Sequence, residues 1–478
     1  IRDAFLMAGA GLLWLSRNFR LVDNPALLAA LADGPLVAVF FVDARTRALG
    51  SAPRWRLERA IRAFDADLRQ RSGQGVLILQ GEAEDLLPDL MARTGATIVH
   101  HADWPEPGTI AVQDRVRARI GAALVLHPGH LLTHPGRLRT GQGGVYKVYS
   151  PFARALRGVG PDRPVRPAPE RITALDPQPG GLPIADLSLA PDMYRGSAVL
   201  DRFALPAGEA AALTRLDGFL DRCAGYGAER DRPDLDSTSG LSDHLALGEI
   251  SPRTIWAMAS LRAEAEPKLQ GAITKFLSEV IWREFAWHLL IDSPQMTHSA
   301  WRPEWDAFPW HGDSPDLEAW RQARTGIALV DAGLREMWVT GRMHNRVRMV
   351  VGSWLTKNLL THWRHGLHHF EECLTDWDPA SNAMNWQWVA GCGPDAAPYF
   401  RVFNPDKQAA DYDPQGRYRR RWLAGYAGAP GAEAAAFLDA LPLGWPIAPI
   451  WRPGDQGRIA TGRARALAAL EAFRDAQP

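Results

Sequence analysis

The sequence predicts an N-terminal Rossmann-like α/β domain with a parallel sheet, joined by a long linker to an all-α domain. Short apolar segments alternate with amphipathic helices over roughly the first hundred residues, as in a doubly wound parallel sheet. A stretch rich in proline and glycine follows, and helical periodicity then continues almost to the end. We therefore expect an α/β domain at 8–133, a linker at 134–206 and an all-helical domain at 207–478.

The α/β domain is expected to contain four strands and three helices. The predicted strands are Leu12–Leu15, Leu36–Val42, Val76–Leu79 and Thr97–His100, and the predicted helices are Pro25–Leu31, Arg56–Arg71 and Ala83–Arg93. No Gly-x-Gly-x-x-Gly sequence follows the first strand, so the fingerprint of a dinucleotide bound to this sheet is absent. Because long structureless loops are uncommon in compact proteins, we expect the linker to wrap over the surface.

The second domain is predicted to be helical throughout, with no internal repeat. Its predicted helices are Glu209–Cys223, Ser251–Arg262, Thr274–Leu290, Asp316–Arg324, Asp331–Val339, Asn345–His362 and Arg463–Arg474.

Composition excludes several classes of protein. With 478 residues, 46% of them hydrophobic, the chain can bury large cores in two or three domains. Its three cysteines are too few and too far apart for a disulfide framework or a cysteine metal site, which favours a reducing cytoplasm. No apolar run reaches the roughly 18 residues of a membrane span, and the first residues lack the features of a secretory signal.

Charge and aromatic content bear on possible partners. The 54 basic and 54 acidic side chains give no net charge, so any DNA-binding surface must be local. The chain has 19 tryptophans, concentrated after residue 250. Some of these rings must fill the core, but the excess indicates a stacking or redox role.

A first candidate site combines Tyr226 with the run Thr238-Ser239-Gly240-Leu241-Ser242, which we place just before a helix near Ser251. Small hydroxyls beside backbone amides at a turn can donate to phosphoryl oxygens. A simple capped loop would explain the same residues.

A second candidate lies on the helix predicted over Thr274–Leu290. Helical spacing places Glu279, Trp282 and Arg283 on neighbouring positions of one face. A flat aromatic ring can stack on a flipped nucleobase while a carboxylate binds its polar edge. The alternative is a surface salt bridge beside a core tryptophan.

A third candidate is the run from Arg342 to Met349. On a helix, Asn345 and Met349 are four residues apart and Arg346 is adjacent, so polar and soft apolar groups converge. The arginines could instead form a solvated face. The histidines at 365, 368 and 369 lack the ordered partners of a metal site, and no metal is predicted.

A fourth candidate is the segment from Asp376 to Pro405, DWDPASNAMNWQWVAGCGPDAAPYFRVFNP. With the three motifs above and the N-terminal WLSRNFRLVDNP, it resembles the photolyase/cryptochrome family, most of all a class I/III-type photolyase for cyclobutane pyrimidine dimers. The resemblance runs from Trp14 to about Trp422. It implies a carbon–carbon lyase in which excited reduced FAD passes an electron to a flipped-out dimer in damaged DNA.

The resemblance also assigns roles to individual residues. Those implied to hold FAD are Tyr226, Thr238, Ser239, Leu241, Ser242, Arg283, Arg348, Asp376, Asp378 and Asn382. Those implied to contact the dimer or its DNA are Glu279, Trp282, Asn345, Arg346, Met349, Trp388 and Arg401, with Lys407 a further candidate for phosphate contact. Trp386, Trp363 and Trp310 match a three-tryptophan electron wire, and with Glu279 and Asn382 they form the implied catalytic set.

Several alternatives stay open. The main rival is a photosensory cryptochrome, a blue-light signalling flavoprotein on the same fold. A flavoprotein electron carrier without DNA would need the flavin residues alone. Asn382 favours repair, because plant sensory cryptochromes usually carry Asp there, and Asn345 after His344 disfavours a (6-4) photoproduct enzyme, which carries paired histidines.

An antenna chromophore, deazaflavin or folate, is uncertain. Residues 101–114 lack the Asn-Glu pattern of a conventional folate pocket. We further expect a monomer in a bacterial-type cytoplasm, associated with the nucleoid when DNA is damaged, and no membrane partner.

Overall fold

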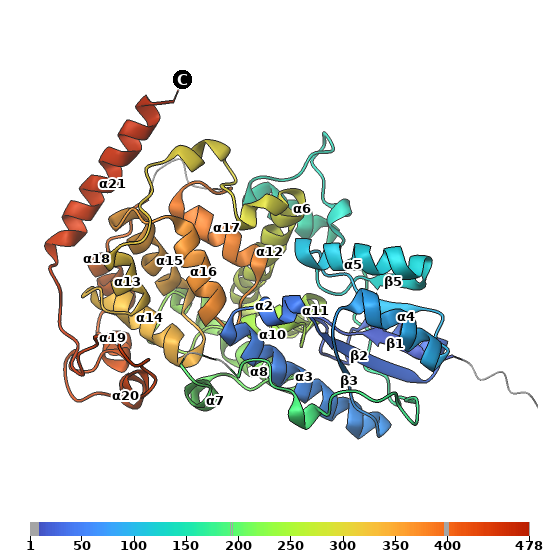
Figure 1. The fold of residues 1–478 in the computed structure, drawn as a ribbon. Helices are drawn as coiled ribbons and strands as arrows, with labels where there is room; N and C mark the ends of the chain where they lie inside the picture. The colour runs from blue at the N-terminus through green and yellow to red at the C-terminus, as the bar shows by residue number, and fades with distance from the viewer. Residues whose placement is uncertain (1–8, 192, 194, 396–400, 478) are drawn as a thin grey trace, which may run out of the picture.

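A computed structural model describes residues 9–191, 193, 195–395 and 401–477. An α/β part, blue to cyan in Figure 1, lies beside a larger helical part coloured green to red. The C-terminal helix α21 (Gly457–Asp475) stands at the outer edge of the helical part. The predicted combination of a parallel α/β domain with a helical domain is confirmed.

The sheet has five parallel strands in the order β3-β2-β1-β4-β5. Their bounds are Gly11–Trp14 (β1), Leu36–Val42 (β2), Leu77–Gln80 (β3), Val99–Ala102 (β4) and Leu124–His127 (β5). Strand β4 begins two residues later than predicted, and β5 was not predicted. Strand β5 is an edge strand: only Leu124 is buried, and the other three residues are half-buried although Val125 and Leu126 are apolar.

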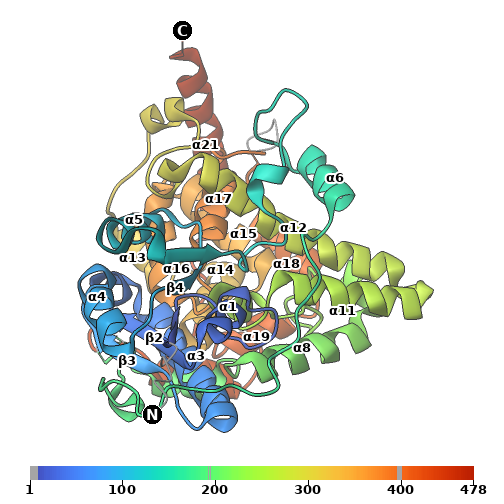
Figure 2. The same ribbon diagram turned by 90° about the vertical axis from the view of Figure 1, so that its right-hand side faces the viewer.

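Helices cover both faces of this sheet (Figure 2). One face packs against α1 (Pro25–Asp33) and α3 (Ser51–Ser72), and the other against α4 (Ala83–Thr94) and α5 (Pro107–Ile120). The short helix α2 (Ala44–Ala48) follows β2. Helix α5 was not predicted, because it buries little apolar surface: Val112 and Val116 are its only fully buried aliphatic residues.

The segment between the two parts contains helices that its composition did not indicate. These are α6 (Tyr149–Val159) and α7 (Ala198–Phe203). Helix α6 buries Phe152, Ala153 and Leu156 and packs against a long helix of the second part. Single bridges join Ala174 to Leu36 and Leu182 to Ile78, so the segment runs along the sheet.

The second part is built from α8 (Glu209–Arg222), α9 (Tyr226–Glu229), α10 (Ser242–Leu247), α11 (Pro252–Ala265), α12 (Gln270–Asp292), α13 (Pro315–Arg321), α14 (Ala328–Thr340), α15 (Asn345–Ser353), α16 (Trp363–Cys373), α17 (Pro379–Ala390), α18 (Pro405–Tyr412), α19 (Arg417–Trp422), α20 (Ala432–Asp439) and α21. The helix predicted over Asn345–His362 is shorter than expected: α15 ends at Ser353 and a π-helical turn continues to Asn358. In that turn the buried Lys357 donates to the carbonyl of Ala390 at the end of α17.

Buried polar contacts fasten the two parts together. Arg56 of α3 forms an ion pair with Glu249, and Asp23 forms one with Arg253 at 2.8 Å. The side chain of Arg20 donates to the carbonyl of Gly248 at 2.9 Å. Because these groups are almost fully buried, the ends of the sheet strands have a fixed position relative to the helices.

Within the described residues, no helix is both long and apolar enough to cross a membrane.

Candidate functional site

A cavity of about 1170 Å³ opens in the helical part, walled by α12, α15, α17 and the loop that precedes α10. Seventeen of the twenty predicted site residues line it: Tyr226, Thr238, Ser239, Leu241, Ser242, Glu279, Trp282, Arg283, Asn345, Arg346, Arg348, Met349, Asp376, Asp378, Asn382, Trp386 and Trp388. Trp310, Trp363 and Arg401 do not line it. Residues separated by up to 162 positions in sequence, Tyr226 and Trp388 at the extremes, therefore meet in one hollow.

The loop before α10 forms one end of the cavity. Tyr226, which begins α9, is buried and packs edge to face on Phe219 with ring centroids 5.3 Å apart. Gly240 has φ +61°, a conformation that favours glycine, and allows the loop to turn. Helix α10, which was not predicted, begins at Ser242 inside the serine and threonine run. The helix predicted near Ser251 follows as α11, and Ser251 is its N-cap.

Asp376 and Arg348 form an ion pair in the wall of the cavity. Both Asp376 oxygens accept from Arg348 Nη2, at 3.0 and 2.7 Å. Burial alone would raise the pKa of Asp376, but the charge and hydrogen bonds of Arg348 outweigh it and hold that pKa below its ordinary value. Asp376 is therefore an anion at neutral pH, with an arginine fixed beside it.

Helix α17 presents Asp378, Asn382, Trp386 and Trp388 to the cavity. Asp378 is its N-cap: its side chain accepts from the backbone N–H of Ser381 at 2.8 Å and from Trp287 Nε1 at 3.0 Å. Asn382 donates through Nδ2 to the Leu367 carbonyl at 3.1 Å. That bond orients the amide so that Oδ1 is the acceptor left for a ligand N–H.

Helix α12 contributes the carboxylate and the flat ring that the sequence placed together. Glu279 forms an ion pair with Arg230, and Lys275 lies 3.8 Å from the same carboxylate. Trp282 is stacked on Tyr149, with ring centroids 3.6 Å apart and planes 3° apart. Neither Arg230 nor Tyr149 was singled out from sequence.

Arg283 lies on the cavity wall, but its guanidinium forms hydrogen bonds to a residue outside the cavity lining. Its guanidinium contacts the ring of His130 at 2.8 Å and the carbonyl of His130 at 3.0 Å. It therefore links the cavity to the segment that follows β5, in addition to any contact with a cofactor.

Helix α15 carries the third group of residues. Asn345 is exposed at the start of the helix, and Arg346 pairs with Asp231 at 2.6 Å. His344 caps the helix through Nδ1, which accepts from the Arg346 N–H at 3.2 Å. Burial lowers the pKa of His344 to about 4, so this histidine is neutral at physiological pH.

The three predicted wire tryptophans differ in exposure. Trp386 borders the cavity, is buried, and packs against α16 at Gly366 and Phe370. Trp363 begins α16 and is fully buried. Trp310 is half-buried, and His362 stands between the two, with ring centroids 5.6 Å from Trp310 and 5.5 Å from Trp363.

Arg401 is exposed outside the cavity, and its guanidinium lies 5.9 Å from the ring centroid of Phe403. Lys407 is also exposed, near the start of α18. Residues 396–400 of the quoted motif lie outside the described residues.

The donors of this cavity suit a large, flat cofactor with phosphates. Hydroxyls gather at the loop end, while an oriented amide and a buried ion pair lie along the walls. Nε1 of Trp386 and Nε of Arg346 are buried and have no hydrogen-bond partner among the described residues. The volume exceeds that of an ordinary small-ligand pocket, so a dinucleotide leaves room for part of a second molecule.

An α/β domain joined to a helical domain with such a cavity defines a class of dinucleotide-binding proteins whose cofactor lies outside the Rossmann-like sheet. Residues 11–170 match the family model described as DNA photolyase, and residues 276–441 match the FAD binding domain of DNA photolyase. The chain belongs to the DNA photolyase family, and its cofactor is FAD.

The similar proteins include both photolyases and a cryptochrome. Deoxyribodipyrimidine photo-lyase of Agrobacterium fabrum is 40% identical over 86% of both chains. A bacterial class III photolyase from Agrobacterium tumefaciens superposes with a TM-score of 0.87 at 36% identity, covering 99% of both chains. A cryptochrome from Synechocystis superposes with a TM-score of 0.81 at 26% identity, covering 95% of this chain and 98% of its own.

Proposed function

We propose that this chain is a light-dependent DNA repair enzyme that splits cyclobutane pyrimidine dimers. The observation that carries the proposal is the joint presence, in one cavity, of the flavin-binding residues and of a separate group suited to a flipped dimer. A flavoprotein that served only as an electron carrier would not need the second group. The relative most similar in sequence among those compared above is itself named a deoxyribodipyrimidine photo-lyase.

Lesion recognition is proposed to use the outer part of the cavity. Trp282 and Trp388 offer ring faces for stacking, and unstacked lesions cost less to extrude than normal bases. Glu279, Asn345 and Arg346 supply polar groups for the edges of the dimer, and Met349 supplies an adaptable apolar contact. Arg401 and Lys407, exposed outside the cavity, are proposed to contact the DNA phosphates.

Cofactor binding is proposed to use the inner part. Tyr226, Thr238, Ser239, Leu241 and Ser242 cradle the phosphates, while Arg283, Arg348, Asp376, Asp378 and Asn382 contact the flavin side. When bound and reduced, FAD supplies on illumination the electron that opens the cyclobutane ring, and it receives that electron back. The protein's own contribution is to hold both groups close, exclude water and keep a fixed charge pattern around them.

Trp386, Trp363 and Trp310 are proposed to carry electrons from the surface to the cavity. Trp386 and Trp363 are both buried and Trp310 is half-buried, so Trp310 is the member of the series that is open to solvent. We also propose that residues 8–133, 134–206 and 207–478 act as antenna-type domain, linker and catalytic domain, and that the protein works as a monomer in the cytoplasm.

The similarity to the Synechocystis cryptochrome keeps photosensing as the competing function. One assay separates the two: purified protein with fully reduced flavin is illuminated with an oligonucleotide that contains one thymine dimer, and dimer loss is measured against a dark control. Light-dependent loss at catalytic turnover supports repair. Glu279→Gln should reduce the repaired fraction per absorbed photon, whereas Glu264→Gln, at an exposed position of α11, should not. No light-dependent loss would overturn the proposal.

A further inference from the structure

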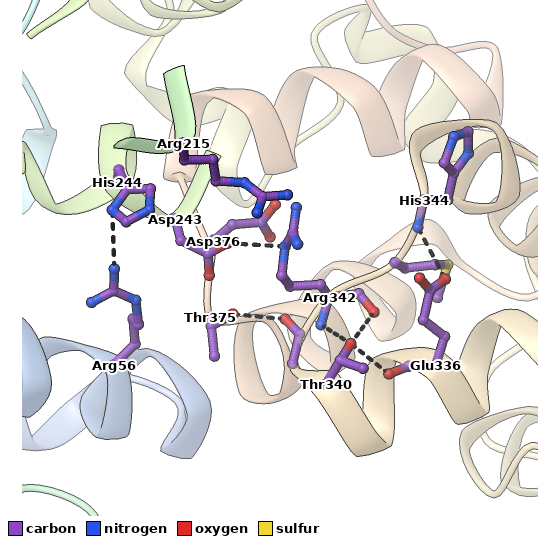
Figure 3. Close-up of polar contacts among 12 residues, drawn as sticks. Arg56, Arg215, Asp243, His244, Glu336, Thr340, Arg342, His344, Thr375 and Asp376 are labelled. Atoms are coloured by element: carbon purple, nitrogen blue, oxygen red, sulfur yellow. Dashed lines mark hydrogen bonds and ion pairs between the residues drawn. The ribbon is translucent and has the colours of Figure 1, made fainter. Parts of the chain in front are cut away.

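Two arginines from distant parts of the chain reach the same wall of the cavity. Arg215 lies on α8, and Arg342 lies on the turn between α14 and α15. Figure 3 shows both beside Asp243, the second residue of α10. Their side chains are 23% and 24% exposed, so each is only partly hydrated.

Carboxylates lie near both arginines, but Nε of Arg215 and Nε of Arg342 have no aligned hydrogen-bond partner among the described residues. Asp243 is buried, and its Oδ2 lies 3.0 Å from Arg342 Nε, but neither atom has an aligned hydrogen-bond partner among the described residues. Asp236 lies 3.9 Å from Arg215 and is 78% exposed, so solvent screens it. Burial, followed by the charge of Arg342, lowers the pKa of Arg215. Asp376, another carboxylate nearby, is already paired with Arg348.

Local structure fixes where both arginines lie. Gly341 has φ +70° and ends α14, and its carbonyl accepts from Thr375 Oγ1 at 3.0 Å, while the Arg342 N–H donates to Thr340 Oγ1 at 3.0 Å (Figure 3). A Cβ at Gly240 would lie 2.3 Å from Arg215 Nε, so a larger residue there would displace the guanidinium, and the φ of +61° at this position also favours glycine. The guanidinium groups are therefore held beside the hydroxyl loop.

We propose that Arg215 and Arg342 clamp the diphosphate of FAD against Thr238, Ser239 and Ser242. The inference concerns the cofactor end of the cavity and rests on the proposed roles of these three hydroxyl residues. A diphosphate would accept from guanidinium N–H groups that Asp243 and Asp236 leave without an aligned partner, and guanidinium forks match phosphate oxygens geometrically. Because the two arginines are charged, FAD affinity should fall as the salt concentration rises, which hydroxyls alone would not cause.

The test measures FAD binding in the dark, without DNA, to the flavin-free full-length chain. Arg342→Gln and Arg215→Gln should each weaken FAD binding by about tenfold at low salt, since each removes a charge-assisted contact. Raising the NaCl concentration should weaken wild-type binding steeply and the variants less, because the screened interaction is already lost. Arg262→Gln is the matched control: Arg262, on α11, pairs with Asp221 of α8 and with Glu266, and it does not line the cavity.

A merely structural role predicts a different result. If the variants bind FAD as tightly as the wild type, or more weakly with an unchanged salt dependence, the clamp is wrong. Thermal unfolding of the flavin-free proteins checks that the variants are folded, and Arg342→Lys should recover part of the salt dependence. Because no light or dimer is used, failure here leaves the repair assay unaffected, and the reverse also holds.

Discussion

Tyr149, the first residue of α6, lies flat on Trp282 of α12, with their ring planes 3° apart. Its hydroxyl donates to the Ser278 carbonyl at 2.9 Å, which anchors the ring to the same helix. One face of Trp282 is thus covered by protein, and the edge of the same ring packs against Phe285 at 5.9 Å. A dimer can stack only on what remains of Trp282 toward the cavity.

Replacing Tyr149 should therefore affect lesion binding through Trp282. Stacked aromatic pairs contribute about 0.5–1.5 kcal/mol beyond area burial, so Tyr149→Leu should weaken dark binding of a dimer-containing oligonucleotide by about two- to twelvefold. Tyr149→Phe keeps the stack and should stay near wild type. Equal losses in both variants would mean that the hydroxyl, and not the stacking, is what matters.

Trp386→Phe should block photoreduction of oxidised FAD, because phenylalanine is much harder to oxidise than tryptophan. Repair by chemically reduced enzyme should continue. Absorption spectra recorded under blue light with an external reductant follow the first quantity, and dimer loss follows the second. Trp256→Phe, a half-buried site on α11 outside the proposed route, is the control. Unchanged photoreduction in Trp386→Phe would refute the route.

Glu284 should make stability depend on pH. Its burial raises the pKa to about 7, against the charge of Arg283 and a 2.7 Å hydrogen bond from the Leu132 N–H. Between its ordinary pKa of about 4.3 and 7, the folded state binds more protons than the unfolded state, so this group makes stability fall as pH rises, by up to roughly 4 kcal/mol. The variant Glu284→Gln has no titrating group at this position, so its stability lacks this contribution to the pH dependence.

Thermal unfolding between pH 5 and 8 tests this sign. The melting temperature of Glu284→Gln relative to wild type should become more favourable as pH increases through this range. The control is Glu264→Gln, at an exposed site. A difference from wild type that stays constant across the range would show that Glu284 does not titrate there.

The ion pair between Arg56 and Glu249 should be a main support of the domain interface. The two side chains are 1% and 0% exposed, and His244 Nδ1 also contacts the carboxylate at 2.5 Å. Arg56→Met would leave a buried carboxylate without its arginine and should destabilise the fold by about 3–5 kcal/mol. Arg59→Met, on the same helix, loses a surface pair with Asp201 and should cost about 1 kcal/mol or less. Chemical denaturation compares the two, and equal losses would contradict the interface role.

Much of the fold could be predicted because local patterns reflect local causes. The seven-residue apolar run Leu36–Val42 became β2 with the predicted bounds, since a central parallel strand is buried on both faces. Helix α12 likewise placed Glu279, Trp282 and Arg283 on one face, because helical period alone determines that relation. Where the pattern was weak the prediction failed, as for β5 and α5, which bury few apolar side chains.

By itself, the sequence determined the two-part fold and the short-range groupings of the site, because backbone hydrogen bonding imposes periods that can be read along a single segment. Only the tertiary structure decided the partners that meet across the cavity. Tyr149 on Trp282, Arg230 on Glu279 and Arg215 beside Arg342 join segments 49 to 133 residues apart. Their meeting depends on how separate helices bury their apolar faces together, and no local period records that.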